Sequence, residues 1–175
     1  MYIPVGISGC GKSSLIQKWD VLKNVVNIEP DQIRKEYCGS VSDQSKNAAV
    51  FELFNHFEQR EMSYGARDVY SNQMHLWFQG MKEECELATQ YGYEPVFIIF
   101  EDSSDWKVCE SRVEKALQKG EDRSVTAGII GRSGKPLIQE MSERFCELVE
   151  SNEFIELTQN YKRFYIKNDL IWESV

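Results

Sequence analysis

Gly6-Ile7-Ser8-Gly9-Cys10-Gly11-Lys12-Ser13 is the stretch that decides the fold of this chain. It matches the pattern G-x-x-x-x-G-K-[ST], which predicts a loop that binds the phosphates of a nucleotide. Its glycines allow backbone conformations that turn successive N–H groups toward an anion. Lys12 would bring a positive charge to the β- and γ-phosphates, and Ser13 would offer a hydroxyl to a magnesium ion that the nucleotide also holds. The predicted nucleotide-binding residues are Gly6, Ser8, Gly9, Cys10, Gly11, Lys12, Ser13 and Ser14, with Ser13 as the metal ligand.

The segments on either side of this loop are typical of a strand and a helix. Tyr2-Ile3-Pro4-Val5 is a short apolar run, and Ser13 to Trp19 is predicted to be a helix whose N-terminus points at the phosphates. Pro4 is unusual there because proline cannot donate a hydrogen bond to a sheet. We expect either that the strand pairs poorly at Pro4 or that no donor is needed on that side.

Length and composition indicate one globular domain over residues 1–175, with 42% hydrophobic and 27% charged residues. No apolar run approaches a membrane span, so we expect no membrane partner. The five cysteines form no C-x-x-C pair, and we interpret them as reduced thiols. Because the glycine-rich loop lies so near the start, we expect no signal peptide and a cytoplasmic protein. The net charge of −8 argues against broad coating of nucleic acid but not against a local basic pocket.

Asp31 and Arg34 follow the second expected strand, Asn24–Ile28, which Pro30 ends. Asp31 sits where a helix would be capped, and Arg34 shares its helix face because the two are three residues apart. Ligands of parallel sheets bind at the carboxyl ends of the strands, so the pair would lie beside the glycine-rich loop. There Asp31 can accept a proton from an attacking hydroxyl, and Arg34 can hold a phosphate or carboxylate of the acceptor. The alternative is that Asp31 is only a helix cap and Arg34 only a surface charge.

The rest of the chain alternates strands and helices, which predicts an α/β fold: a parallel sheet of about four to five strands with helices on both faces. Expected strands cover Arg67–Ser71, the strongly apolar Glu94–Phe100, Glu153–Leu157 and Phe164–Ile171. Expected helices cover Gln44–Tyr64, Glu83–Gln90, Trp106–Leu117, a short stretch from Val125, and Pro136–Val149.

Three features of the chain together resemble the kinase domain of phage-type polynucleotide kinases, a branch of the P-loop NTPases. They are Gly6–Ser13, Asp31-x-x-Arg34, and the charged loop Asp122-Arg123-Ser124-Val125. The resemblance spans about Tyr2 to Val149. It implies a P-loop kinase fold with a helical lid, and transfer of the γ-phosphate of ATP to the 5′-hydroxyl of a DNA or RNA end.

The same resemblance implies a role for each candidate residue. Lys12 and Ser13 would handle ATP and Mg²⁺, and Asp31 would be the general base on the 5′-hydroxyl. Arg34 would hold the nearest phosphate of the acceptor. Arg123 would belong to a lid that contacts the ATP phosphates and stabilises the charge in transfer. The implied catalytic residues are thus Lys12, Asp31 and Arg123.

The chain departs from that family in two places. The family commonly carries Asp-x-Thr-Asn after its third strand, where this chain has Asn72-Gln73-Met74-His75; Asn72 and His75 remain candidates for contacting the acceptor. A lid usually offers two arginines, whereas only Arg123 is clear here. The candidate replacements are Lys119, Arg132 and Lys135. Trp77 and Phe78 would either stack on a base or belong to the core.

Two other functions remain open. One is a P-loop kinase of a small molecule such as a nucleoside, nucleotide or metabolite, with a kinase of a modified base in DNA as a variant of the nucleic-acid hypothesis. The other is a nucleotide-binding switch without catalysis. A basic groove leading to Asp31 and wide enough for a strand would favour a nucleic-acid acceptor, and a closed pocket would favour a small molecule. The sequence leaves the oligomeric state open.

Overall fold

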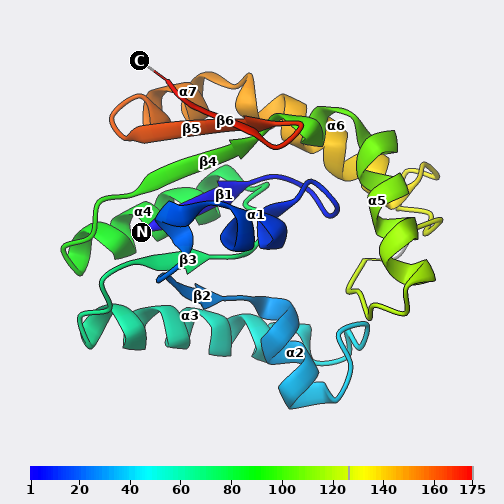
Figure 1. Cartoon of the computed structure of the whole chain (residues 1–175), viewed down its shortest axis with the longest axis horizontal. Helices are drawn as coiled ribbons and strands as arrows, with labels where there is room; N and C mark the ends of the chain where they lie inside the picture. Colours follow the sequence, from blue (N-terminus) through cyan, green and yellow to red (C-terminus); the bar gives the residue numbers. More distant parts are fainter. Residues whose placement is uncertain (126, 175) are drawn as a thin grey trace.

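The chain forms a mixed α/β fold around a six-stranded, mostly parallel sheet (Figure 1). The computed structural model describes residues 1–125 and 127–174. The strand order is β2-β3-β1-β4-β5-β6; β1 to β5 run parallel, and β6 runs antiparallel to β5. The strands are β1 Tyr2–Val5, β2 Val26–Ile28, β3 Val69–Ser71, β4 Val96–Phe100, β5 Lys162–Lys167 and β6 Leu170–Glu173. The predicted α/β class is confirmed, with more strands than the four to five expected.

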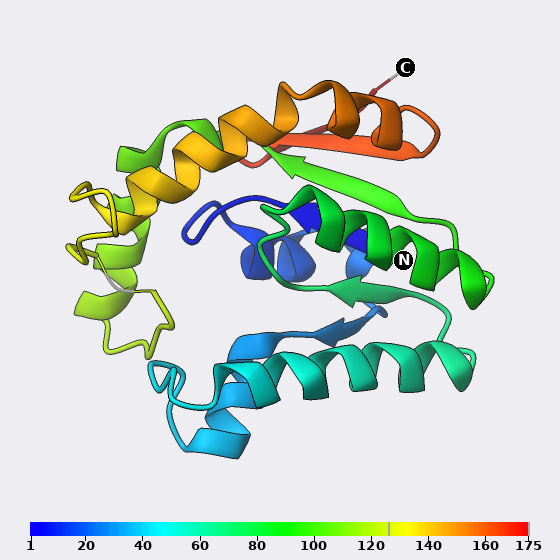
Figure 2. The same ribbon diagram turned by 180° about the vertical axis from the view of Figure 1, so that it is seen from behind.

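Helices cover both faces of this sheet (Figures 1 and 2). Helix α1 lies on one face, and α4, α6 and α7 lie on the other, while α3 runs beside α2 along the β2 edge. The helices are α1 Lys12–Lys18, α2 Pro30–Cys38, α3 Asn47–Ser63, α4 Phe78–Gln90, α5 Trp106–Gln118, α6 Leu137–Val149 and α7 Asn152–Thr158. Within residues 1–125 and 127–174, no helix is both long enough and apolar enough to cross a membrane.

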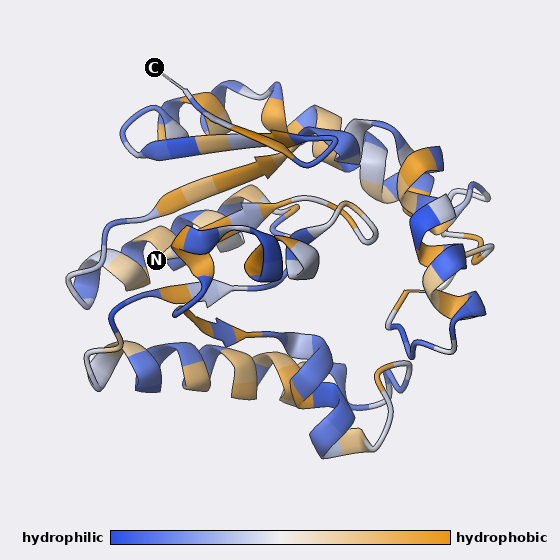
Figure 3. Ribbon diagram, in the orientation of Figure 1, coloured by the Kyte–Doolittle hydropathy of each residue, from blue (hydrophilic) through white to orange (hydrophobic). Residues whose placement is uncertain are grey.

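The core is centred on β1 and β4. Ile3, Val5, Phe97 and Ile98 are completely buried, and Figure 3 shows β4 as apolar along its length. A strand covered on both faces needs apolar side chains at every position, which explains why this segment does not alternate. The carboxyl ends of β1, β2 and β3 open toward the loop Gly6–Ser13, and this edge carries the polar residues discussed below.

Pro4 fits its strand because a side chain replaces the missing strand neighbour. Tyr2 pairs with Tyr70 of β3, and Pro4 turns its backbone groups to the same side. There β3 has already ended at Ser71, and the Pro4 carbonyl lies 2.7 Å from Nδ1 of His75. Since a carbonyl can only accept, Nδ1 carries the proton. Pro4 therefore needs no N–H donor on this side, which is the second of the two expectations for this strand.

The predicted boundary at α2 was wrong. The helix begins at Pro30, with the extended Glu29 before it, so Asp31 lies inside the first turn and is not the cap. Proline suits the first helical position because its missing N–H would have no partner there. Helix α3 likewise begins at Asn47, three residues after the predicted start.

Three predictions in the second half of the chain were also wrong. Glu153–Leu157 is helical, because the Ser151 hydroxyl accepts a hydrogen bond from the Phe154 N–H and caps α7. The predicted strand Phe164–Ile171 is a hairpin instead, turning at Asn168 and Asp169, which both have positive φ. Val125 starts no helix: Ser124 and Val125 form a bend, Ala127 and Gly128 a turn, and Thr126 of the predicted helix lies outside the described residues.

Candidate active site

The loop Gly6–Ser13 joins β1 to α1 and depends on two glycines for space. A Cβ on Gly9 would lie 2.3 Å from the carbonyl oxygen of Cys109 on α5, and φ at Gly9 is +82°. A Cβ on Gly6 would lie 2.7 Å from the Cys10 sulfur, although Gly6 has no positive φ. Gly6 is therefore needed for space, and not for the conformational freedom expected from the sequence. Gly11 has φ +108° and open space around it, so the loop is accessible on that side.

Lys12 and Ser13 are held by polar contacts at the mouth of this loop. The Lys12 Nζ donates to the carbonyl oxygens of Gly6 at 3.1 Å and Ile7 at 2.7 Å. The Ser13 hydroxyl donates to Glu29 at 3.1 Å and accepts from Asn72 Nδ2 at 3.3 Å. Burial is the main reason why the pKa of Glu29 is raised. Glu29 was missed by the sequence analysis; its place directly after β2, at the ligand-binding edge, was the available signal.

Asp31 and Arg34 form an ion pair on α2, and both line the cavity beside the loop. Arg34 is almost completely buried, and its Nη2 donates to Asn47 Oδ1 at 2.8 Å. The second carboxylate oxygen of Asp31 accepts a 2.8 Å hydrogen bond from the Ser124 hydroxyl. The pair is thus neither a helix cap nor a surface charge, because α2 turns it toward the cavity.

The charged loop after α5 lies against the loop between α2 and α3. The Asp122 carboxylate accepts from the Val41 N–H at 2.8 Å and from the Ser40 hydroxyl at 3.0 Å. These hydrogen bonds, the one from Val41 first, hold the pKa of Asp122 below its usual value. The contact brings Arg123 and Ser124 to the wall of the same cavity as Asp31.

One large cavity of about 1200 Å³ contains the loop and both charged segments. Ser8 to Ser14, Asp31, Arg34, Asn72, His75 and Arg123 all line it, whereas Gly6 does not. Cationic side chains outnumber acidic ones on its wall, although the whole chain carries a net charge of −8. Eight cationic side chains line it against four acidic ones, Glu29, Asp31, Glu121 and Asp169. The cationic residues are Lys12, Lys18, Arg34, Arg112, Lys115, Lys119, Arg123 and Arg144.

Two of these arginines retain a buried donor with no partner among the described residues. They are the Nε groups of Arg34 and Arg123. A buried guanidinium N–H without an acceptor is costly. Guanidinium groups bind phosphate and carboxylate oxygens with several donors, and both arginines line the cavity. The cavity therefore suits a ligand with several negatively charged oxygens.

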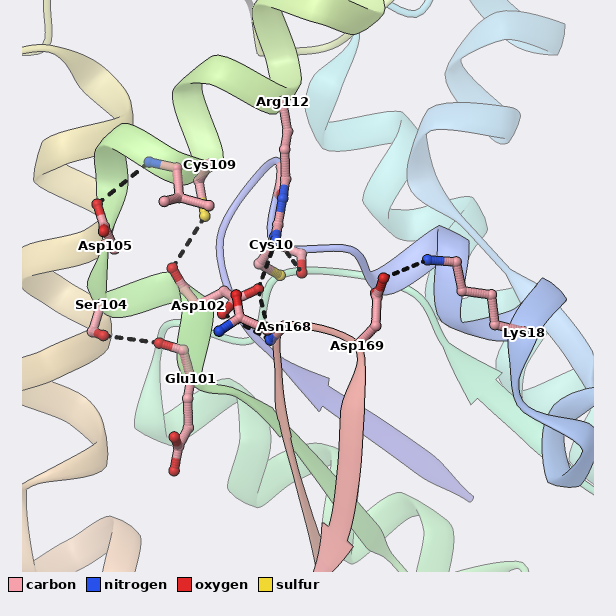
Figure 4. A network of polar contacts seen from close by, with 12 residues as sticks. Cys10, Lys18, Glu101, Asp102, Ser104, Asp105, Cys109, Arg112, Asn168 and Asp169 are labelled. Atoms are coloured by element: carbon pink, nitrogen blue, oxygen red, sulfur yellow. Dashed lines mark hydrogen bonds and ion pairs between the residues drawn. The ribbon is translucent and has the colours of Figure 1, made fainter.

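Arg112 is a further basic residue at the loop, and the sequence analysis missed it. Its Nη2 donates to Asp102 at 2.8 Å, and its Nη1 lies 3.5 Å from the carbonyl oxygens of Gly9 and Cys10 (Figure 4). Asp102 also accepts from the backbone N–H of Asn168, in the β5–β6 turn. No sequence pattern marks Arg112, because its place depends on how α5 lies over the loop.

His75 is a buried residue whose two ring nitrogens both have protein partners. Nδ1 donates to the Pro4 carbonyl, and Nε2 contacts the carboxylate of Glu84 on α4. Glu84 lies near Glu58 of α3; burial first, and the charge of Glu84 second, raise the pKa of Glu58 well above its usual value. His75 lines the cavity but is anchored in this cluster, defined as Glu58, Ser71, His75 and Glu84.

Two candidate lid residues lie away from the cavity. Neither Arg132 nor Lys135 lines it, and Lys135 pairs with Glu143 at 2.7 Å, whereas Lys119 does line it. Among residues 1–125 and 127–174, no three His, Cys, Asp or Glu side chains are grouped so that they could hold a metal ion.

The chain matches no family model, and no curated protein matches it significantly.

Proposed function

We propose that this chain is an ATP-dependent phosphotransferase with a P-loop kinase fold, similar to the kinase domain of phage-type polynucleotide kinases. Its reaction would transfer the γ-phosphate of ATP to the 5′-hydroxyl of a DNA or RNA end. One observation carries the proposal: a single cavity is lined by the loop with Lys12, by Asp31 with Arg34, and by Arg123. These are the phosphate-binding, acceptor-orienting and charge-stabilising parts that phosphoryl transfer needs.

The nucleotide phosphates fit the open side of the loop. The space around Gly11, the position of Lys12 and the positive charge of Arg123 on the cavity wall all suit anionic oxygens. The hydroxyl of Ser13 and the carboxylate of Glu29 are hard oxygen ligands of the kind that Mg²⁺ prefers, and phosphate oxygens would complete the set. A magnesium ion bound there would supply neutralisation of the charge on the β- and γ-phosphates.

Asp31 would receive the proton of the acceptor. Its carboxylate already accepts a hydrogen bond from one hydroxyl, that of Ser124 at 2.8 Å, and an acceptor hydroxyl would replace it. As that hydroxyl attacks the γ-phosphorus, a new O–P bond forms, the bond to the ADP oxygen breaks, and the proton passes to Asp31. Arg34, which lies beside Asp31 and lines the cavity, would hold a phosphate of the acceptor strand.

The direct experiment supplies ATP labelled on the γ-phosphate together with Mg²⁺ and measures transfer to 5′-hydroxyl DNA and RNA oligonucleotides. Nucleosides and nucleotides are tested in parallel, and Lys12→Ala serves as the inactive control. Label on an oligonucleotide supports the proposal. Label on the small acceptors alone replaces it with a small-molecule kinase. ATP bound without transfer to any acceptor favours the non-catalytic switch.

A further inference from the structure

Trp77 is an exposed aromatic residue on the cavity wall. Of the four tryptophans, Trp77 alone lines the cavity, and 68% of it is exposed. Its neighbour Phe78 is half-buried and packs against the core. The alternatives considered from the sequence therefore divide between the two residues: Phe78 belongs to the core and Trp77 does not. A large apolar ring left in water at a ligand cavity needs an explanation.

The surroundings of Trp77 are suited to a flat ligand with negative charges nearby. The guanidinium of Arg144, on α6, lies over the indole ring at 5.0 Å from its centre, and both residues line the cavity. Gly80, one turn further along α4, leaves open space where a side chain would stand. Leu137 and Met141 add apolar surface to the same wall.

The position of Trp77 is fixed relative to the phosphate-binding loop. The Gly6 N–H donates to the Met74 carbonyl at 3.0 Å, which ties the segment before Trp77 to the loop. His75 holds a positive φ of +50° and is anchored on both sides by Pro4 and Glu84. A non-glycine residue in this conformation is maintained only when its surroundings enforce it. The ring is thus held on a rigid support and does not lie on a loose loop.

We infer that Trp77 and Arg144 form a stacking subsite for a base of the acceptor. This inference rests on the proposed function and deepens it, because it assigns the acceptor to molecules that carry a nucleobase. Proteins that bind single-stranded nucleic acid without sequence preference use exposed aromatic rings beside cationic side chains. The basic wall of the cavity complements the strand's phosphates, whereas a sugar or other metabolite without a base would leave Trp77 without a role.

The test compares a complete, short 5′-hydroxyl oligonucleotide with three versions of it. Each version has an abasic residue at one position: the first, the second or the third. Trp77→Ala is expected to raise the KM for the complete acceptor by about 10- to 100-fold and to leave the KM for ATP unchanged. With the base removed at the stacked position, wild type and variant are expected to have the same KM. For the complete acceptor, Trp77→Phe, which keeps a π-face, is expected to have a KM between those of wild type and Trp77→Ala.

Trp172→Ala is the matched control, because Trp172 is also exposed but lies on β6 and outside the cavity lining. Thermal unfolding is measured for every variant, to check that each one folds. A Trp77→Ala variant with an unchanged acceptor KM, or with the same rise for every abasic acceptor, would overturn the inference while the kinase activity stands.

Binding is measured separately, by quenching of tryptophan fluorescence with the same oligonucleotides. Quenching that is lost in Trp77→Phe but kept in Trp172→Phe would support the subsite even if no phosphate were transferred, and would then count against the proposed function alone. Quenching that does not depend on Trp77 would count against the subsite.

Discussion

The Ser124 hydroxyl donates a 2.8 Å hydrogen bond to the carboxylate of Asp31, although 93 residues separate the two in the chain. Arg34 contacts the other oxygen of the same carboxylate. Asp122, two residues before Ser124, fixes this charged loop to Val41. The candidate base is therefore held between α2 and the charged loop, and it already accepts a hydrogen bond from a hydroxyl group.

Asp31→Asn separates hydrogen bonding from proton transfer. The amide oxygen of the new side chain can still accept from Ser124, but the amide cannot take a proton from an acceptor. We expect kcat for phosphate transfer to fall by about 10²- to 10⁴-fold. The affinity for ATP should stay unchanged, since Asp31 lies on α2 and not in the loop Gly6–Ser13. Steady-state transfer and equilibrium binding of a fluorescent ATP analogue measure the two quantities.

Ser124→Ala is the matched control for that variant. It removes the hydroxyl donor and leaves the carboxylate of Asp31 in place, still paired with Arg34, so kcat is expected to stay within about tenfold of wild type. Turnover at the wild-type rate in Asp31→Asn would show that Asp31 is not the base.

Arg123 and Lys135 are two of the candidate lid cations, and their effects on phosphate transfer can be compared. Arg123 lines the cavity; its Nη2 lies 3.4 Å from a carboxylate oxygen of Glu121, and its buried Nε has no partner among the described residues. Lys135 is exposed, lies outside the cavity lining and pairs with Glu143. Arg123→Lys keeps the charge but loses the planar fork of donors, and we expect kcat to fall by about 10²-fold. Lys135→Ala should leave kcat unchanged. An equal loss of kcat in Arg123→Lys and Lys135→Ala would mean that Arg123 has no specific role in phosphate transfer.

The parts of the site that follow one another at fixed spacing could be predicted from the sequence. The pattern of Gly6–Ser13 by itself predicts a phosphate-binding loop, and Asp31 and Arg34 share a helix face whichever residue begins the helix. The misplaced cap therefore did not affect the prediction for the pair.

Residues positioned by distant contacts could not be predicted in this way. Arg112 reaches the loop only because α5 lies over Gly9, and Glu29 is close to Ser13 only because β2 and β1 end at the same edge. His75 has the expected position after β3, but its anchoring depends on Glu84, nine residues further along the chain. At the C-terminal end, short apolar segments fit strand and helix patterns equally, and the Ser151 cap decided for helix.

Gly9→Ala tests the geometry of the loop independently of any activity. The new methyl group would clash with the Cys109 carbonyl at 2.3 Å, in addition to the strain of φ +82°. We expect the free energy of unfolding to fall by about 1–3 kcal/mol or more. Gly39→Ala is the matched control, because Gly39 has φ +87° but open space around it. Chemical denaturation should show the smaller loss for Gly39→Ala; equal losses would mean that the contact between α5 and the loop is not tight.

Glu58→Gln tests the buried cluster beneath the site. Glu58 is 2% exposed, and burial, followed by the charge of Glu84, raises its pKa well above the usual 4.5; His75 is the basic group that faces Glu84. The folded chain thus keeps a proton on Glu58 that the unfolded chain releases above about pH 4.5. This contribution to stability is fully present below that pH and is lost as pH rises toward the raised pKa.

Glutamine imitates the protonated carboxyl group at every pH, so Glu58→Gln should remove this loss. Its Tm is expected to exceed that of wild type at about pH 8, by about 2–4 °C for each kcal/mol recovered, and to approach it at about pH 5. Glu52→Gln is the control, because Glu52 is exposed on the same helix, and its Tm difference should not change with pH. A Glu58→Gln variant that is less stable at the higher pH would show that Glu58 is ionised in the folded protein.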